Sequence, residues 1–244
     1  MKAILIVGNW ASGKSELLGH YQQKFVALGT PTIPDSDRIR FEEAVLLDAR
    51  EQGVWDGQRW VGEHSYLTRD GEPGHRHFMV RSGIIPNREH DRMIADIRST
   101  PEGTVRLVEY AIGNDIKEFE GESRTPFLQS GAYLLGLLGQ HGVKKDVGIV
   151  ELIAPVGLRL ARQFRRDDRT DGDAFFAYAQ DGGELYPYAD TLDGIYVPFH
   201  NTHEDLTGFW RHADDIFDTY IIPRIRGEGV VRPLEGSIQK EEER

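Results

Sequence analysis

Short apolar runs and helical patterns alternate along the chain. Branched and aliphatic residues fill 3–7, which predicts a strand buried on both faces of a sheet. Apolar residues then recur at helical spacing from 14 to a stop at Gly29, which predicts a helix. The apolar positions of this helix are Leu17, Leu18, Tyr21, Phe25 and Val26. An extended piece over 30–38 precedes a charged helical stretch that ends near Arg50.

The alternation continues through the rest of the chain. Buried strands are expected over 105–111, 146–155 and 192–199. Helices are expected over 87–98, 126–140, 156–180 and 203–222. Strands that alternate with helices are typical of an α/β fold, so we predict a doubly wound parallel sheet.

Residues 53–86 break this pattern. Two extended arms flank the turn-rich stretch "RDGEPG", which predicts an inserted β-hairpin. We therefore expect one domain over 1–226, with an inserted subdomain at 53–100 and a lid at about 156–180. The remaining residues, 227–244, are expected to form a C-terminal tail.

Composition narrows the classes of partner. The 244 residues include no cysteine, which excludes disulfides and thiolate metal sites and fits a cytoplasmic protein. The net charge of −11 means that a nucleic-acid partner would need a local basic groove. No apolar run has the length of a membrane span, and the opening "MKAILIVG" is too short for a signal peptide. We expect no membrane partner.

The stretch "GNWASGKS" lies between the first strand and the first helix and fits G-x-x-x-x-G-K followed by Ser or Thr. Its glycines let backbone N–H groups point inward around phosphate oxygens, and the helix N-terminus adds a partial positive charge. Lys14 is expected to reach the β- and γ-phosphates, and the Ser15 hydroxyl to ligate Mg²⁺. The predicted nucleotide-binding residues are Gly8, Asn9, Trp10, Ala11, Ser12, Gly13, Lys14 and Ser15.

With this loop the chain resembles the P-loop nucleoside triphosphatases. The form "NWASGKS" after a short first strand is similar to their kinase branch, and the layout of 1–50 and 104–225 follows it. The resemblance implies a P-loop kinase fold, ATP and Mg²⁺ as nucleotide and metal, and transfer of a phosphoryl group.

Two acids and an arginine follow the second predicted strand, in "PDSDRIR". The carboxyl ends of the strands in an open α/β sheet face the ligand crevice, and a carboxylate there can accept the proton of a hydroxyl. The spacing of Asp35 and Arg38 is similar to polynucleotide kinases and related P-loop enzymes. This resemblance implies that Asp35 is the general base and that Arg38 contacts the acceptor. Asp37 is the alternative base, and a helix-capping role is the alternative for Asp35.

A second acid is expected to support the metal. Glu109 lies near the end of the predicted strand over 105–111, where P-loop enzymes carry a carboxylate that binds Mg²⁺ through water or positions the attacking group; an acid with only a structural role is the alternative. Glu151, in "GIVELIAP", competes for this role, but apolar residues continue after it.

An arginine-rich segment, "LRLARQFRRDDR", follows the fourth predicted strand. Arg162 and Arg166 share one helix face, and the segment resembles the lid helices of nucleotide kinases. The resemblance implies that these two arginines contact phosphates, whereas the alternative is a solvated helix balanced by nearby acids. Asn201 matches the position after the last strand of nucleotide kinases, near the adenine; a turn or cap is its alternative role.

These features together predict an ATP-dependent phosphotransferase with a hydroxyl acceptor. The acceptor is expected to be a nucleoside, nucleotide or nucleic acid, with a 5′-hydroxyl or a modified-base hydroxyl in DNA as options. Aromatic and arginine side chains in 53–100 support that class because they can stack a base and hold phosphates, whereas packing of the insertion onto the sheet is their alternative role. The alternatives are a small-metabolite kinase and a P-loop ATPase or switch that acts on a protein partner.

Overall fold

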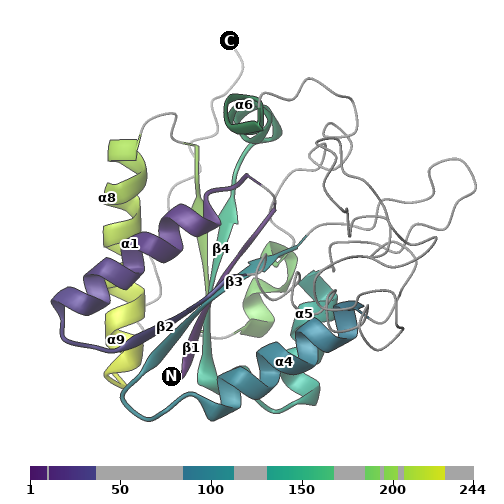
Figure 1. The fold of residues 1–244 in the computed structure, drawn as a ribbon, viewed down its shortest axis with the longest axis vertical. Helices are drawn as coiled ribbons and strands as arrows, with labels where there is room; N and C mark the ends of the chain where they lie inside the picture. The colour runs from purple at the N-terminus through teal and green to yellow at the C-terminus, as the bar shows by residue number, and fades with distance from the viewer. Residues whose placement is uncertain are drawn as a thin grey trace, which may run out of the picture.

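A five-stranded parallel sheet in the order β2-β3-β1-β4-β5 lies at the centre of the molecule (Figure 1). The strands are β1 (Ala3–Gly8), β2 (Thr32–Asp35), β3 (Val105–Ala111), β4 (Val147–Ile153) and β5 (Tyr196–His200). The computed structural model describes residues 1–9, 11–36, 85–112, 131–167, 185–192, 195–202 and 206–228. The predicted doubly wound parallel sheet is confirmed.

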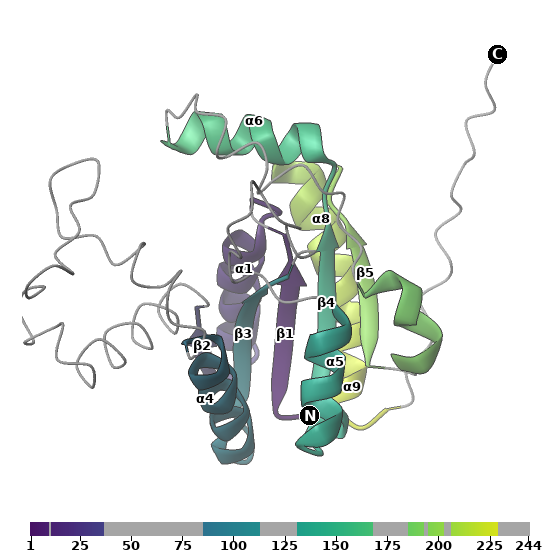
Figure 2. The ribbon, with the colours of Figure 1, turned by 90° about the vertical axis from the view of Figure 1, so that its right-hand side faces the viewer.

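Helices cover both faces of the sheet (Figure 2). One face carries α1 (Lys14–Ala27), α8 (Leu206–Ile216) and α9 (Ile222–Ile225), and the other carries α4 (Ile85–Ser99) and α5 (Gly131–Gln140). Helix α6 (Val156–Asp167) lies across the carboxyl ends of the strands. Two 3₁₀ helices, η2 (Lys144–Asp146) and η3 (Tyr186–Leu192), and a π-helix, η4 (Phe217–Ile221), complete the described elements.

The central strand β1 explains why its sequence is apolar throughout. Leu5 and Val7 lie in the core cluster with α4 and α5, whereas Ile4 and Ile6 lie in the cluster with α1 and α8. Successive side chains of a strand point to opposite faces, so a strand between two helix layers needs apolar residues at every position. All six residues of β1 are buried.

Several expected boundaries differ from the observed ones. Val26 is not on the buried face of α1 but is 68% exposed, since it lies about 100° around the helix from Phe25. The strand expected over 192–199 begins at Tyr196, because η3 occupies the residues up to Leu192. The helix expected over 87–98 is observed as α4, with two more residues at its start and one at its end, and it packs on the sheet.

The hairpin expected over 53–86 falls almost wholly outside the described residues, as do the charged stretch to Arg50 and the tail from 229. Of the lid expected over 156–180, the described residues end at Asp167. None of the described helices combines the length and apolar character of a bilayer-spanning segment.

The helix expected over 203–222 contains a π-helical turn at Phe217–Ile221. Pro223 follows this turn and has no backbone N–H to donate, so regular α-helical pairing cannot continue through it. The wider turn brings Phe217, Tyr220 and Ile221 into one core cluster together. The sequence pattern alone does not distinguish this turn from an α-helix.

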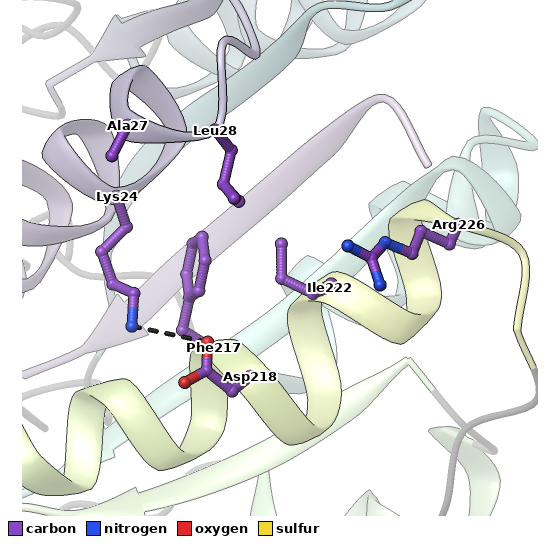
Figure 3. A pocket seen from close by; sticks show the side chains of 7 residues that line it. All are labelled: Lys24, Ala27, Leu28, Phe217, Asp218, Ile222 and Arg226. Carbon is purple, nitrogen blue, oxygen red and sulfur yellow. Dashed lines mark hydrogen bonds and ion pairs between the residues drawn. The ribbon is translucent and has the colours of Figure 1, made fainter.

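The C-terminal half of α1 is held to this helix by charge and ring contacts (Figure 3). Lys24 Nζ lies 2.8 Å from Asp214 Oδ1 and 3.4 Å from Asp218 Oδ1, and 4.8 Å from the centre of the Phe217 ring. His20 Nε2 lies 2.8 Å from the same Asp214 oxygen. A cavity of about 380 Å³ lies beside these groups, at the opposite end of α1 from the glycine-rich loop.

The packing predicts that the same substitution has different effects at two leucines. Leu17→Ala removes a fully buried side chain of α1 and is expected to lower the free energy of unfolding by about 2–5 kcal/mol. Leu206→Ala, at a position 60% exposed, is expected to change it by less than about 0.5 kcal/mol. Denaturant unfolding measures both values, and equal losses of unfolding free energy in the two variants would contradict the assigned core.

Candidate functional site

The glycine-rich loop has a backbone that only certain residues adopt. Gly13 has φ 101°, in the left-handed region, and directly precedes the first residue of α1. A Cβ on Gly8 would lie 2.8 Å from the Leu152 carbonyl oxygen, so the strand next to it leaves no room for a side chain. Ala11 also adopts positive φ, at 55°. The two motif glycines are therefore required by backbone conformation and by close packing.

Polar side chains of the loop are buried. Asn9, Ser12 and Lys14 are each less than a tenth exposed. Lys14 Nζ donates to the Asn9 carbonyl oxygen at 3.2 Å, so the lysine lies back over the loop. Asn9 Nδ2 and Ser12 Oγ have no hydrogen-bond partner among the described residues. Buried groups of this kind normally have partners, so they are candidates to bind a ligand.

The two residues predicted to support a metal are in contact. Ser15 lies in the first turn of α1 and donates to Glu109 Oε1 at 2.7 Å. Glu109 reaches it from β3, where it is paired with Ile6 of the central strand and is 7% exposed. A hydroxyl and a carboxylate are oxygen donors that Mg²⁺ accepts, so the pair fits that ion.

Glu151, the alternative acid, has other partners. Its carboxylate accepts hydrogen bonds from the Leu185 backbone N–H at 3.0 Å and the Tyr196 hydroxyl at 2.7 Å. Burial and the neighbouring carboxylate raise the pKa of Tyr196 well above its usual value, so this hydroxyl stays protonated and donates. Glu151 is fully buried in a structural network, and the contact with Ser15 favours Glu109 as the metal-supporting acid.

Arg162 and Asn201 meet at the loop. Asn201 follows β5, is fully buried, and donates from Nδ2 to the Ser12 carbonyl oxygen at 2.7 Å. Arg162, on α6, donates from Nη1 to the same oxygen at 3.3 Å and from Nη2 to Asn201 Oδ1 at 3.2 Å. The Ala11 carbonyl oxygen lies 3.5 Å from Arg162 Nη1. Both predicted residues therefore contact the loop from its carbonyl side.

Asp35 lies on the other face of the sheet from Ser15 and Glu109. It pairs with Val108, whose side chain belongs to the core cluster with α4 and α5. Its Oδ2 lies 3.8 Å from Arg106 Nη1, which is also 3.6 Å from Asp96 Oδ2 of α4. Asp35 is 9% exposed and ends β2 at the edge where the loop begins.

Other predicted residues are placed only in part. Arg166 belongs to α6, but its side chain is outside the described part of the structure, as are Trp10, Asp37 and Arg38. Arg159, from the same arginine-rich segment, is fully buried and donates from Nε to the Ala154 carbonyl oxygen at 3.1 Å. Arg159 therefore supports the start of α6.

Sequence reasoning missed Arg106, which contacts the predicted base. The signal was present, because a charged residue stands among apolar neighbours in the run over 105–111. Among the described residues, no group of three or more His, Asp or Glu side chains is arranged to hold a metal. A metal at Ser15 and Glu109 would need further oxygen ligands from its substrate or from water.

No protein-family model and no curated protein matches the chain. Among solved structures, TT1252 from Thermus thermophilus is similar, with 14% sequence identity and a TM-score of 0.50 over 89% of this chain and 96% of TT1252. A gluconokinase from Sinorhizobium meliloti matches at 12% identity and a TM-score of 0.45, over 93% and 97% of the two chains. Shikimate kinase from Acinetobacter baumannii, in complex with shikimate, matches at 15% identity and a TM-score of 0.40, over 93% of this chain and 94% of the kinase.

The chain has the fold of P-loop kinases. The strand order and the loop between β1 and α1 carry this assignment. Identities of this size describe the fold alone, so the chemistry must be argued from the P-loop and its surroundings.

The P-loop geometry predicts opposite effects of one substitution at two glycines. Gly13→Ala places a Cβ at a left-handed position and 3.1 Å from Asn201 Nδ2, and should lower the free energy of unfolding by about 1–3 kcal/mol. Gly136→Ala, within α5 and with no atom within 4 Å of the new Cβ, should raise it by about 0.5–1 kcal/mol. Chemical denaturation of both variants measures the difference, and a stabilised Gly13→Ala protein would refute the loop conformation.

Proposed function

We propose that the protein is an ATP-dependent phosphotransferase that moves the γ-phosphate of ATP to a hydroxyl group. The observation that carries the proposal is the contact of Ser15 with Glu109 beside the P-loop lysine, Lys14. A phosphate-binding loop and an oxygen pair suited to Mg²⁺ then lie at the carboxyl edge of one parallel sheet, where ligands of such folds bind.

Each P-loop group has a defined task in this proposal. The loop N–H groups and the N-terminus of α1 bind phosphate oxygens, and Lys14 moves from the Asn9 carbonyl oxygen to the β- and γ-phosphates. Ser15 and Glu109 would hold Mg²⁺, which when bound would neutralise part of the phosphate charge. Catalysis by such a site is mostly positioning and electrostatic stabilisation.

The acceptor is proposed to bind on the α4 side of the sheet, where Asp35 ends β2. Asp35, or Asp37 two residues later, accepts the proton of the hydroxyl as the phosphoryl group is transferred. Arg106 Nη1, on β3, lies 3.8 Å from Asp35 Oδ2, and this ion pair supports the proposed position of the base. Arg38 and Arg166 are proposed to contact the acceptor and the transferred phosphate.

For the acceptor we propose a nucleoside, a nucleotide or a nucleic-acid hydroxyl. The support is the D-x-x-R spacing of Asp35 and Arg38 and the aromatic and arginine residues of 53–100. The net charge of −11 favours a small acceptor within this class over a long duplex.

The proposal predicts Lys14-dependent transfer to one class of acceptor. Labelled ATP with Mg²⁺ is incubated with nucleosides, nucleoside monophosphates, 5′-hydroxyl oligonucleotides, hydroxymethylated DNA or small polyols and hydroxy acids. Lys14→Met should reduce transfer at least about 100-fold, because the charge on the transferring group loses its cation. Lys145→Ala, an exposed lysine at the opposite edge of the sheet, should leave the rate unchanged. Equal ATP consumption with every acceptor and with Lys14→Met would overturn the proposal.

The role of Asp35 as base is tested against a control variant at Asp96, the other carboxylate that pairs with Arg106. Asp35→Asn is expected to reduce transfer at least about 100-fold while ATP affinity changes less than about twofold. Asp96→Asn removes the other carboxylate on Arg106 and should retain near-normal transfer. If Asp96→Asn loses as much transfer as Asp35→Asn, Asp35 acts only through the ion pair. If Asp37→Asn alone abolishes transfer, Asp37 is the base.

A further inference from the structure

We infer that Asn201 and Arg162 are positioning residues that fix the orientation of a P-loop peptide and link it to α6. The inference rests on the proposed function, because it assigns the support of that same phosphate site. It differs from direct roles for these two residues at the adenine and at the phosphates.

The contacts converge on one carbonyl group. The Ser12 oxygen accepts from Asn201 Nδ2 at 2.7 Å and from Arg162 Nη1 at 3.3 Å. Arg162 Nη2 also donates to Asn201 Oδ1 at 3.2 Å, so the amide is engaged at both ends. The Asn201 backbone N–H donates to the Ile153 carbonyl oxygen at 2.8 Å, which fixes the residue to the end of β4. Asn201 is fully buried.

The geometry of the peptide bond gives these contacts a consequence for phosphate binding. In a trans peptide the C=O and the next N–H point in opposite directions. Two donors on the Ser12 oxygen therefore hold the Gly13 N–H toward the other side of the loop, which is the side of the phosphate nest. Neither side chain needs to touch the nucleotide to affect its affinity.

The pair also connects elements that are distant in sequence. Asn201 follows β5, Arg162 lies on α6 after β4, and Ser12 belongs to the loop after β1. These three strands are neighbours in the sheet, in the order β1-β4-β5. A shift of α6 would move Arg162, which donates to the Ser12 oxygen and to the Asn201 amide. The loop is therefore expected to respond to the position of that helix.

The test compares ATP with tripolyphosphate, which has phosphates but no base. Affinities of both ligands, with Mg²⁺, are measured by calorimetry for the wild type, Asn201→Ala, Arg162→Met and the double variant. Each single variant should bind both ligands about tenfold more weakly, and the double variant no more weakly than the weaker single. Asn201→Asp keeps the side-chain volume but replaces the donor with a carboxylate, and should bind both ligands at least as weakly as Asn201→Ala.

Each other result has a distinct meaning. If Asn201→Ala weakens ATP but not tripolyphosphate, the residue contacts the base and the inference is wrong. If the double variant binds both ligands about a hundredfold more weakly, the losses of affinity multiply, so the two residues act independently and the inference is wrong. Wild-type protein that binds neither ligand would overturn the proposed function itself, and the inference with it.

A matched control separates this role from general stability. Arg224 Nη2 donates to the Val147 carbonyl oxygen at 3.1 Å, an arginine-to-backbone contact at the other end of β4. Arg224→Met should lower the thermal midpoint without changing either affinity. If Arg224→Met weakens both ligands as much as Arg162→Met at equal loss of thermal stability, the effect is structural and the inference fails.

Discussion

A loop that directs N–H groups at a phosphate has few of them left to hold itself together, and in this loop the Ser12 N–H donates to the Asn9 carbonyl oxygen at 3.3 Å. In this chain the hydrogen bond from Asn201 to the Ser12 carbonyl supplies the missing support from outside the loop. The same amide packs closely on the residue before α1, since Asn201 Nδ2 lies only 3.1 Å from where a Gly13 Cβ would be. The loop is therefore shaped by residues almost two hundred positions away as much as by its own glycines.

The sheet separates the two halves of the proposed chemistry. Because side chains alternate along β3, Glu109 points toward α1 while Arg106 and Val108 point toward α4. The oxygen pair for a metal thus lies on one face and the proposed base, Asp35, on the other, and both reach the same edge. Nucleotide and acceptor are expected to approach from different sides and to meet above the ends of β1 and β3.

Much of this arrangement could be predicted from the sequence where the signal is local. The apolar run of β1 follows from periodicity, and the glycine spacing and the expected role of Ser15 follow from motif chemistry, whereas the choice of Glu109 over Glu151 needed the contact with Ser15. The partners of Arg162 and Asn201 could not be predicted, because contacts with backbone carbonyls leave no side-chain pattern. The face on which Asp35 lies depends on its register with Val108, and the π-helical turn depends on how Phe217 and Tyr220 pack, so both needed the tertiary structure.

That π-helical turn restricts how the chain can change in length. The turn holds one residue more than a regular α-helical turn, so loss of one residue within Phe217–Ile221 would restore α-helical pairing, whereas loss of one residue in α8 would rotate everything beyond it by about 100°. After such a loss in α8, Arg224 would turn away from the Val147 carbonyl that it now contacts, and Ile225 away from the core cluster. Substitution is tolerable along this helix wherever side chains face solvent, whereas the packing against the sheet allows loss of a single residue only at the π-helical turn.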